Sequence, residues 1–193
     1  MVKVRQPESA ETPDTRTRII DAASILFRRG GYAGTGLKRI AADSGATFGS
    51  IYHFFPGGKE ELAAHAIRTS GEAYGQLVMT LLHAVADPLD ALQHAFQVAA
   101  ADLEDADYAD ACPIAGIALE VASSNQTLRV ATAEVFTGWV EASTDWFDRW
   151  IQDAPTARQL PQSMIMLLEG AFLLSRPCET PNRYWPPGAP WPL

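Results

Sequence analysis

The sequence has few of the residues that build disulfide frameworks and metal centres. Its 193 residues include only 2 Cys and 4 His. Cys112 and Cys178 lie far apart in the chain, and neither has a second Cys or a His at the spacing of metal ligands. We therefore expect free thiols in the reducing cytoplasm, and no metal or other cofactor.

Also missing are the long apolar segments that carry a chain into or across a membrane. A spanning helix needs about 18 consecutive apolar residues, and the sequence has no such run. The N-terminal stretch, MVKVRQPESAETPDT, lacks the apolar core of a secretion signal. We therefore expect neither secretion nor a membrane partner.

Patterns typical of catalysis are missing too. No Gly-rich phosphate-binding loop follows a predicted strand. Cys112 precedes a proline at the start of an apolar segment, which indicates a buried structural thiol rather than a nucleophile. The histidines have neither metal-ligand spacing nor a paired catalytic partner: His53, His65, His83 and His94. These absences argue against an enzyme.

Positive charge is scarce in the whole chain but concentrated near its N-terminus. The net charge is −8. Residues 1–70 carry ten Lys and Arg against seven Asp and Glu, a net +3, whereas residues 71–193 carry five against sixteen, a net −11. Residues 15–59 hold seven basic side chains and two acidic ones. A basic N-terminal part on an acidic body is expected of a protein whose N-terminal part faces DNA phosphates.

Residues 37–55, LKRIAADSGATFGSIYHFF, predict two short helices joined by a tight turn. One face of the first helix is marked by apolar residues spaced three and four apart: Leu37, Ile40 and Ala41. Gly45 can take the positive φ that ends this helix, and Thr47 can cap the next one through its hydroxyl. Such a pair of helices is typical of the helix-turn-helix motif, although an ordinary helical hairpin has the same turn.

The second of these helices has two unlike faces. Its buried face is expected to consist of Ile51, Phe54 and Phe55. Its free face is expected to consist of Phe48, Gly49, Ser50, Tyr52 and His53. In a helix-turn-helix motif the N-terminal residues of this second helix contact base edges in the major groove.

Helices are also expected on both sides of the motif. The pattern predicts a helix over residues 15–29 that residues 30–31 stop. Thr35 is expected to cap the helix that begins near Gly36, where its hydroxyl and the free N–H groups would form an anion site. A helix over residues 59–85 would then connect the N-terminal part to the body.

The body shows helical periodicity and no alternating strand pattern. The segment CPIAGIALEVA is almost wholly apolar and is expected to be buried. The tail that begins at Pro177 contains six prolines and is not expected to form a helix. The expected body helices cover residues 87–105, 125–153 and 161–175.

These motifs make residues 15–67 resemble the DNA-binding domain of the TetR family of one-component bacterial transcriptional repressors. The matching segments are TRIIDAASILFRRGGYAGTGLKRIAADSG, then YHF and KEEL. PGGKEELAAHAI and CPIAGIALEVA are similar to the subgroup that contains LmrA and YxaF. The resemblance implies an all-α chain with a flexible arm (1–14), a helix-turn-helix domain (15–60), a helical effector-binding and dimerisation domain (61–176) and a proline-rich tail (177–193).

The resemblance also assigns roles to residues of the N-terminal domain. It implies that Thr35 and Lys59 contact phosphates and that Tyr52 and His53 contact the DNA backbone. Most relatives have a polar or basic residue where this chain has Phe48, which can contact a thymine methyl group. The full expected set of DNA-contacting residues is Thr35, Lys38, Thr47, Phe48, Gly49, Ser50, Tyr52, His53 and Lys59.

The implied function is a repressor that a small apolar or cationic molecule releases from double-stranded operator DNA. The implied assembly is a homodimer joined through the last two body helices, yet the proline-rich tail stands where a further helix is expected. The expected effector pocket is lined by Met79, Phe96, Phe136, Trp139 and Trp146. The alternative is a helical ligand-sensing or interaction protein without sequence-specific DNA binding.

Overall fold

The computed structural model describes residues 13–110 and 112–179, and all regular elements in these two ranges are helices. The all-α prediction is therefore confirmed. Eight helices follow one another: α1 Thr15–Gly34, α2 Leu37–Ser44, α3 Phe48–Phe54, α4 Gly58–Ala84, α5 Pro88–Asp105, α6 Ala115–Val121, α7 Gln126–Phe147 and α8 Ala154–Cys178. Residues 1–12 of the predicted N-terminal arm and most of the proline-rich tail lie outside the described residues, whereas Asp14 caps α1.

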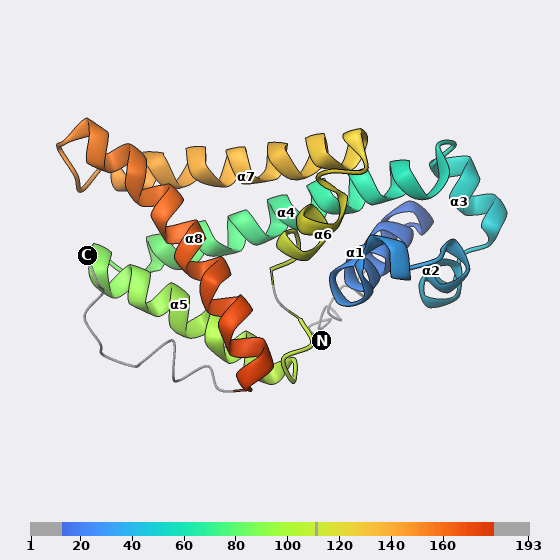
Figure 1. The fold of residues 1–193 in the computed structure, drawn as a ribbon, viewed down its shortest axis with the longest axis horizontal. Helices are drawn as coiled ribbons and strands as arrows, with labels where there is room; N and C mark the ends of the chain where they lie inside the picture. Colours follow the sequence, from blue (N-terminus) through green and yellow to red (C-terminus); the bar gives the residue numbers. More distant parts are fainter. Residues whose placement is uncertain (1–12, 111, 180–193) are drawn as a thin grey trace, which may run out of the picture.

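The three N-terminal helices gather at one end of the molecule, and α4 leads from them into the body (Figure 1). As predicted, α4 is a connecting rod, since its 27 residues span roughly 40 Å. It packs against α1 at the N-terminal end and against α5 and α7 in the body, while α8 packs against α7. None of the helices within the described ranges is long and apolar enough to cross a membrane.

One hydrophobic core joins the N-terminal helices to the body. It runs from Ile19 and Phe27 of α1, through Leu62 and Ile67 of α4, to Leu128 of α7. The predicted domain boundary at residue 60 therefore falls inside a continuous helix with a shared core. A second, smaller buried cluster lies at the far end of the body and contains Leu82, Ala91, Leu92, Ala95, Trp146, Phe147 and Met164.

The connection from α1 to α2 differs from the prediction in one detail. Gly31 has a φ of 71°, so the chain breaks its helical path there and resumes a last turn to Gly34. The cap residue of α2 is Gly36, and the Thr35 hydroxyl donates instead to the carbonyl oxygen of Leu26 at 3.0 Å. The expectation that Thr35 caps α2 is therefore wrong, because its hydroxyl is hydrogen-bonded to the backbone of α1.

The last two helices also have other bounds than predicted. Helix α7 ends at Phe147 rather than near 153, because a tight turn follows in which the N–H groups of Trp150 and Ile151 donate to the Phe147 carbonyl oxygen. Asp153 then caps α8 by accepting from Thr156 N at 3.0 Å. The earlier start gives α8 two more turns. It also continues through Pro177, so the first residues of the predicted non-helical tail are helical.

Helix α6 is a surface helix, which corrects the expectation that its whole segment is buried. Ile117 and Val121 face the core and are 4% and 1% exposed. Leu119 is 83% exposed. A helix of this length can bury only one face when it lies against a single layer, so the apolar composition alone overestimates its burial.

Helices α4 and α7 approach each other closely at two glycines. A Cβ atom on Gly71 would lie 2.5 Å from Val135 Cγ1, and one on Gly75 would lie 2.8 Å from Trp139 Cδ1. The indole N–H of Trp139 donates to the Gly71 carbonyl oxygen at 2.8 Å. These small residues thus let an aromatic side chain of α7 pack directly on the α4 backbone.

We expect Gly71→Ala to destabilise the fold. The added methyl group would force Val135 and the helix axes apart, which typically costs about 1 to 3 kcal/mol of unfolding free energy. Gly138→Ala is the matched control, since a Cβ there meets nothing within 4 Å and should be neutral or stabilising. Urea unfolding of both variants tests this, and equal stabilities would refute the close approach.

Candidate nucleic-acid interface

The turn between α2 and α3 has the geometry that the sequence predicts. Gly45 ends α2 with a φ of 65°, in the left-handed region. Thr47 caps α3, because its hydroxyl oxygen accepts from Ser50 N at 3.0 Å. The same oxygen lies 2.9 Å from the Ser50 hydroxyl. The start of α3 therefore presents two hydroxyl groups whose positions are fixed by the cap.

Helix α3 is anchored by one face and exposes the other. Ile51 and Phe55, at its end, are completely buried. Phe48 and Tyr52 are 47% and 51% exposed, although aromatic side chains usually seek cover. Gly49 and His53 are exposed beside them. An exposed aromatic face on a short, firmly seated helix is unusual for a monomeric surface and marks a binding face.

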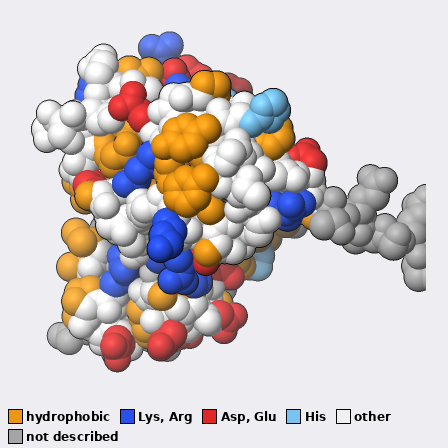
Figure 2. All heavy atoms as spheres, turned by 90° about the vertical axis from the view of Figure 1, so that its right-hand side faces the viewer, with side chains coloured by type: hydrophobic (Ala, Val, Ile, Leu, Met, Phe, Trp, Pro, Cys, Tyr) orange, Lys and Arg blue, Asp and Glu red, His pale blue; other side chains and the backbone are white. Residues whose placement is uncertain are grey.

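Basic side chains surround this face. Figure 2 looks at the end of the molecule that carries α2 and α3, and it shows Lys and Arg side chains around a central group of hydrophobic ones. Lys38 of α2 is exposed and makes no ion pair within residues 13–110 and 112–179. Arg39 is paired with Asp43 at 2.9 Å. Lys38 is therefore the freer positive charge on α2.

Lys59 lies at the start of α4, next to the same surface. Its ammonium nitrogen is 4.3 Å from the centre of the Tyr32 ring, which is a cation–π distance. Partial burial lowers the pKa of Lys59, and the nearby carboxylate of Glu120 opposes this shift. The ring contact thus holds the charge near the N-terminus of α4.

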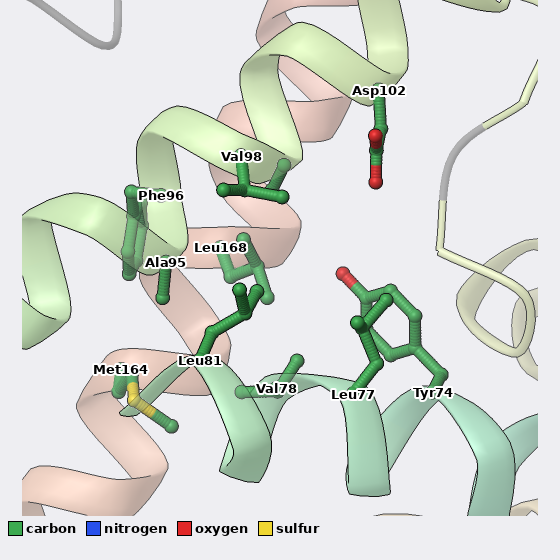
Figure 3. Close-up of a pocket in the computed structure, with 11 residues that line it drawn as sticks. Tyr74, Leu77, Val78, Leu81, Ala95, Phe96, Val98, Asp102, Met164 and Leu168 are labelled. Atoms are coloured by element: carbon green, nitrogen blue, oxygen red, sulfur yellow. The ribbon is translucent and has the colours of Figure 1, made fainter. Parts of the chain in front are cut away.

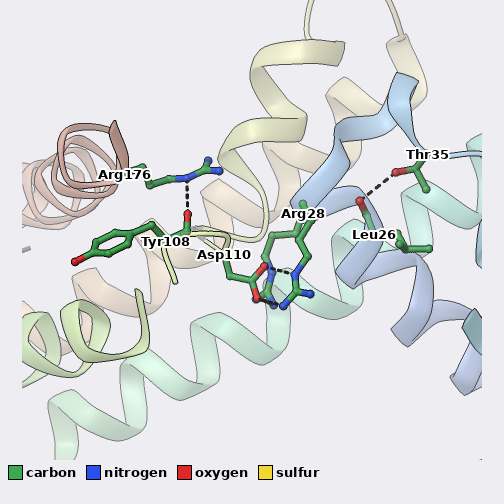
Figure 4. Close-up of polar contacts among 7 residues, drawn as sticks. Leu26, Arg28, Thr35, Tyr108, Asp110 and Arg176 are labelled. Carbon is green, nitrogen blue, oxygen red and sulfur yellow. Dashed lines mark hydrogen bonds and ion pairs between the residues drawn. The ribbon is translucent and has the colours of Figure 1, made fainter. Parts of the chain in front are cut away.

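Thr35 does not belong to the exposed surface. It is 4% exposed, and its hydroxyl points to the Leu26 carbonyl oxygen (Figure 4). Of the residues expected to contact DNA, seven lie on α2, on α3 or at the cap of α3 and are exposed or half-exposed: Lys38, Thr47, Phe48, Gly49, Ser50, Tyr52 and His53. Lys59 borders this face, and the Thr35 side chain faces away from it.

Two of the basic residues counted toward DNA binding contact the body instead. Arg29 donates two hydrogen bonds to Asp110, at 2.8 and 2.9 Å, and Arg28 donates a third at 2.7 Å (Figure 4). The hydrogen bond from Arg29 lowers the pKa of Asp110 more than burial raises it. The sequence analysis does not predict this contact. The acidic stretch ending at Asp110 is the only feature of the sequence that hints at a partner for the two arginines.

A second carboxylate from the body binds the backbone of α1. Glu120 of α6 accepts from the N–H groups of Tyr32 and Ala33, each at 2.6 Å. A Cβ on Gly31 would lie 2.7 Å from one oxygen of this carboxylate. Gly31 is thus required twice, for its positive φ and for the space that Glu120 occupies. Glu120 thereby also comes near Lys59.

Among the pockets that the described residues of the body form, two share part of their lining. One lies between α4, α7 and α8, and the other lies between α4, α5 and α8 (Figure 3). Met79 and Trp139 of the expected effector pocket line the first cavity, and Phe96 lines the second. Phe136 packs edge-on against Trp139, while Trp146 is 2% exposed in the core and lines neither cavity.

Comparison with known proteins decides the family. Residues 19–66 match the model of bacterial regulatory proteins of the tetR family, and residues 88–182 match the LmrA/YxaF-like C-terminal domain of transcriptional regulators. The chain belongs to the TetR family of transcriptional regulators. It is 33% identical to the HTH-type transcriptional regulator YxaF of Bacillus subtilis over 84% of this chain and 85% of YxaF. It is 30% identical to LmrA of the same species over 84% and 86%.

Solved structures share the fold of this TetR-family chain. A TetR-family regulator from Cytophaga hutchinsonii matches with a TM-score of 0.74 and 24% identity, over 92% of this chain and 90% of that one. The reduced form of NemR from E. coli matches with a TM-score of 0.74 and 18% identity, over 89% and 92%. The family assigns DNA binding to the N-terminal domain and effector sensing with dimerisation to the C-terminal domain. It is a family of regulators and not of enzymes.

We expect the contact of Asp110 with α1 to weaken at acid pH. Because its pKa is lowered on folding from a usual 3.8, its contribution is complete above that value and is lost as the pH falls through the lower folded value. At neutral pH, Asp110→Asn should cost about 1 kcal/mol, a modest figure because Arg29 is half-exposed. The difference from the wild type should vanish as the pH falls. Asp105→Asn, at an exposed site, is the control in urea unfolding at several pH values.

Proposed function

We propose that this TetR-family chain is a homodimeric repressor that a small apolar or cationic molecule releases from its operator. The observation that carries the proposal is the exposed aromatic and polar face of α3, which the buried Ile51 and Phe55 hold in place. Family membership supports the proposal, because the same helix lies in the DNA-reading part of the matched N-terminal domain.

Contacts to bases are assigned to the start of α3. The hydroxyl groups of Thr47 and Ser50 can donate to or accept from base edges, and Gly49 leaves room for close approach of the backbone. The exposed Phe48 ring can contact the methyl group of a thymine. Such contacts give sequence preference, whereas contacts to phosphates give position and most of the affinity.

Contacts to phosphates are assigned to residues around this reading surface. Lys38 and Lys59 supply positive charge on either side of α3, and Tyr52 and His53 supply polar groups on its exposed face. The Thr35 side chain is not assigned a phosphate contact, because it is buried and its hydroxyl already donates within the protein. The positive charges that remain are few, so we expect a shallow dependence of affinity on salt.

The dimer interface is assigned to the exposed apolar face of α8. Met166 and Leu173 are 66% and 71% exposed, and they lie two helical turns apart on one face. Leu167 and Leu174 extend the same face and are 41% and 49% exposed. A two-fold pairing through this face would place two copies of α3 in successive major grooves, about 34 to 36 Å apart or somewhat more.

An effector acts in this proposal by binding the DNA-free state better than the DNA-bound state. A path from the body cavities to α1 exists in the described contacts. Arg176 of α8 donates to the Tyr108 carbonyl oxygen at 3.1 Å, and two residues further along the chain Asp110 binds Arg28 and Arg29 (Figure 4). A shift of α8 around a ligand can therefore reach the end of α1.

The assignment of Lys59 is tested by Lys59→Gln. Removing one phosphate-contacting charge from each protomer should weaken binding to operator and random DNA similarly. It should flatten the slope of log affinity against log salt by about two units for the dimer, one for each copy of Lys59. Arg149→Gln is the matched control, since Arg149 is an exposed basic residue after the end of α7, far from α3. Fluorescence anisotropy over a range of salt concentrations gives both slopes. An unchanged slope for Lys59→Gln would remove this residue from the contact surface.

The assignment of the dimer interface is tested by Leu173→Glu. A charge buried between two copies of α8 should convert the dimer to a monomer and weaken operator binding by about 100-fold or more. Leu119→Glu is the matched control, since Leu119 is the more exposed leucine and lies on α6, outside the proposed interface. Sedimentation equilibrium measures the mass. A monomeric wild type, or dimers in both variants, would contradict the assignment.

A further inference from the structure

A carboxyl group without a full set of partners lies in the wall of the cavity between α4, α7 and α8. Glu169 of α8 lines this cavity, and its Oε1 atom is buried and makes no hydrogen bond within the described residues. The buried thiol of Cys112 hydrogen-bonds the same carboxyl group, and burial raises the pKa of Glu169. A buried carboxylate oxygen without a donor is costly, so the site favours whatever supplies one.

Among the described residues, no positively charged side chain lines this cavity or the one between α4, α5 and α8. Arg68, which is paired with Glu134, lines a third pocket that shares Met79 and Trp139 with the first. The first cavity has Glu169 as its only charged lining residue, and the second has Asp102. Tyr74 is common to both, and Figure 3 shows its hydroxyl directed toward the α5 side that carries Asp102. The remaining lining is largely aliphatic or aromatic. The Ser143 hydroxyl also lines the first cavity but already donates to the Trp139 carbonyl oxygen. The polar groups that remain are two carboxyl groups and one phenol.

We propose that the effector is an amphiphilic organic cation whose positively charged nitrogen binds Glu169 and whose apolar body packs between α4, α7 and α8. The inference rests on the proposed function, in which an effector occupies the body. A cation supplies both the missing hydrogen bond and the missing countercharge. An uncharged ligand could supply only the first, and an anion would be repelled.

The aromatic and flexible side chains of the cavity suit such a ligand. Trp139 is held in place by the hydrogen bond from its indole N–H to Gly71, so its ring is a fixed wall with a face that attracts cations. Met79 and Met164 line the same space and have thioether side chains that can adopt several rotamers.

Glu169 also lies where a bound ligand could change the contacts that hold α1. Its neighbour Cys112 is two residues from Asp110, which binds Arg28 and Arg29. A ligand that draws the Glu169 carboxylate toward the cavity would weaken its contact with Cys112 and disturb the segment that holds α1. The same residue would then both select the ligand and transmit its presence.

The test compares two probes that differ in charge but not in length. Phenylbutylamine is protonated at neutral pH, and phenylbutanol carries a hydroxyl in place of the ammonium group. Calorimetric titration of the full chain should show the amine binding about tenfold more tightly or better. Glu169→Gln, which keeps the shape of the side chain, should reduce this ratio to about one or two. Glu141→Gln, at an exposed site on α7, should leave the ratio unchanged.

Equal affinity of the wild type for both probes would overturn the inference, as would a ratio that survives in Glu169→Gln. The wild-type comparison needs no variant, so it stands even if Glu169→Gln folds poorly. DNA binding of the same preparations, measured by fluorescence anisotropy, separates the two proposals. If the chain binds its operator but has equal affinities for the two probes, only the proposal of a cationic effector is refuted. If the chain binds no DNA, the proposed function is refuted, and the probe affinities still decide whether the cavity prefers a cation.

Discussion

The attachment of the C-terminal end of α1 to the body is the contact on which the placement of the N-terminal helices depends. Asp110 binds two arginine side chains there, and Glu120 binds two backbone N–H groups. Both carboxylates come from the segment between α5 and the end of α6, so the orientation of α1 is set by the body. Because α1 shares a core with α2 and α3, this contact also sets the orientation of the reading surface.

The same contacts explain how an acidic protein can present a basic surface. Much of the negative charge lies on the body, where Asp110 and Glu120 are used to hold the N-terminal helices. The basic residues that remain exposed around α3 are those without a partner on the body, such as Lys38. Some basic side chains of the N-terminal helices therefore hold these helices to the body, and others remain free to contact DNA. The net charge of the N-terminal segment overestimates the positive charge that is available to phosphates.

The sequence predicts the reading surface well because its signals are local. A glycine with positive φ, a threonine cap and apolar residues at helical spacing each act within one or two turns, and Gly45, Thr47 and Ile51 behave as their neighbours suggest. The contacts of Asp110 and Glu120 join residues about eighty positions apart, so no local pattern marks them. For the same reason the position of Glu169 in the cavity wall becomes visible only in the folded chain. The Thr35 hydroxyl contacts Leu26, only nine residues away, but the break at Gly31 that turns it inward is not marked by the helical pattern.

Selection of binding sites from a library of random DNA duplexes tests the central claim most directly. The account predicts enrichment of one two-fold symmetric sequence, with half-sites about one helical turn or somewhat more apart, whose affinity falls with rising salt. Random competitor DNA should not displace the protein from the selected site. A library that shows no enrichment after repeated rounds, with weak binding to all sequences alike, would contradict the account.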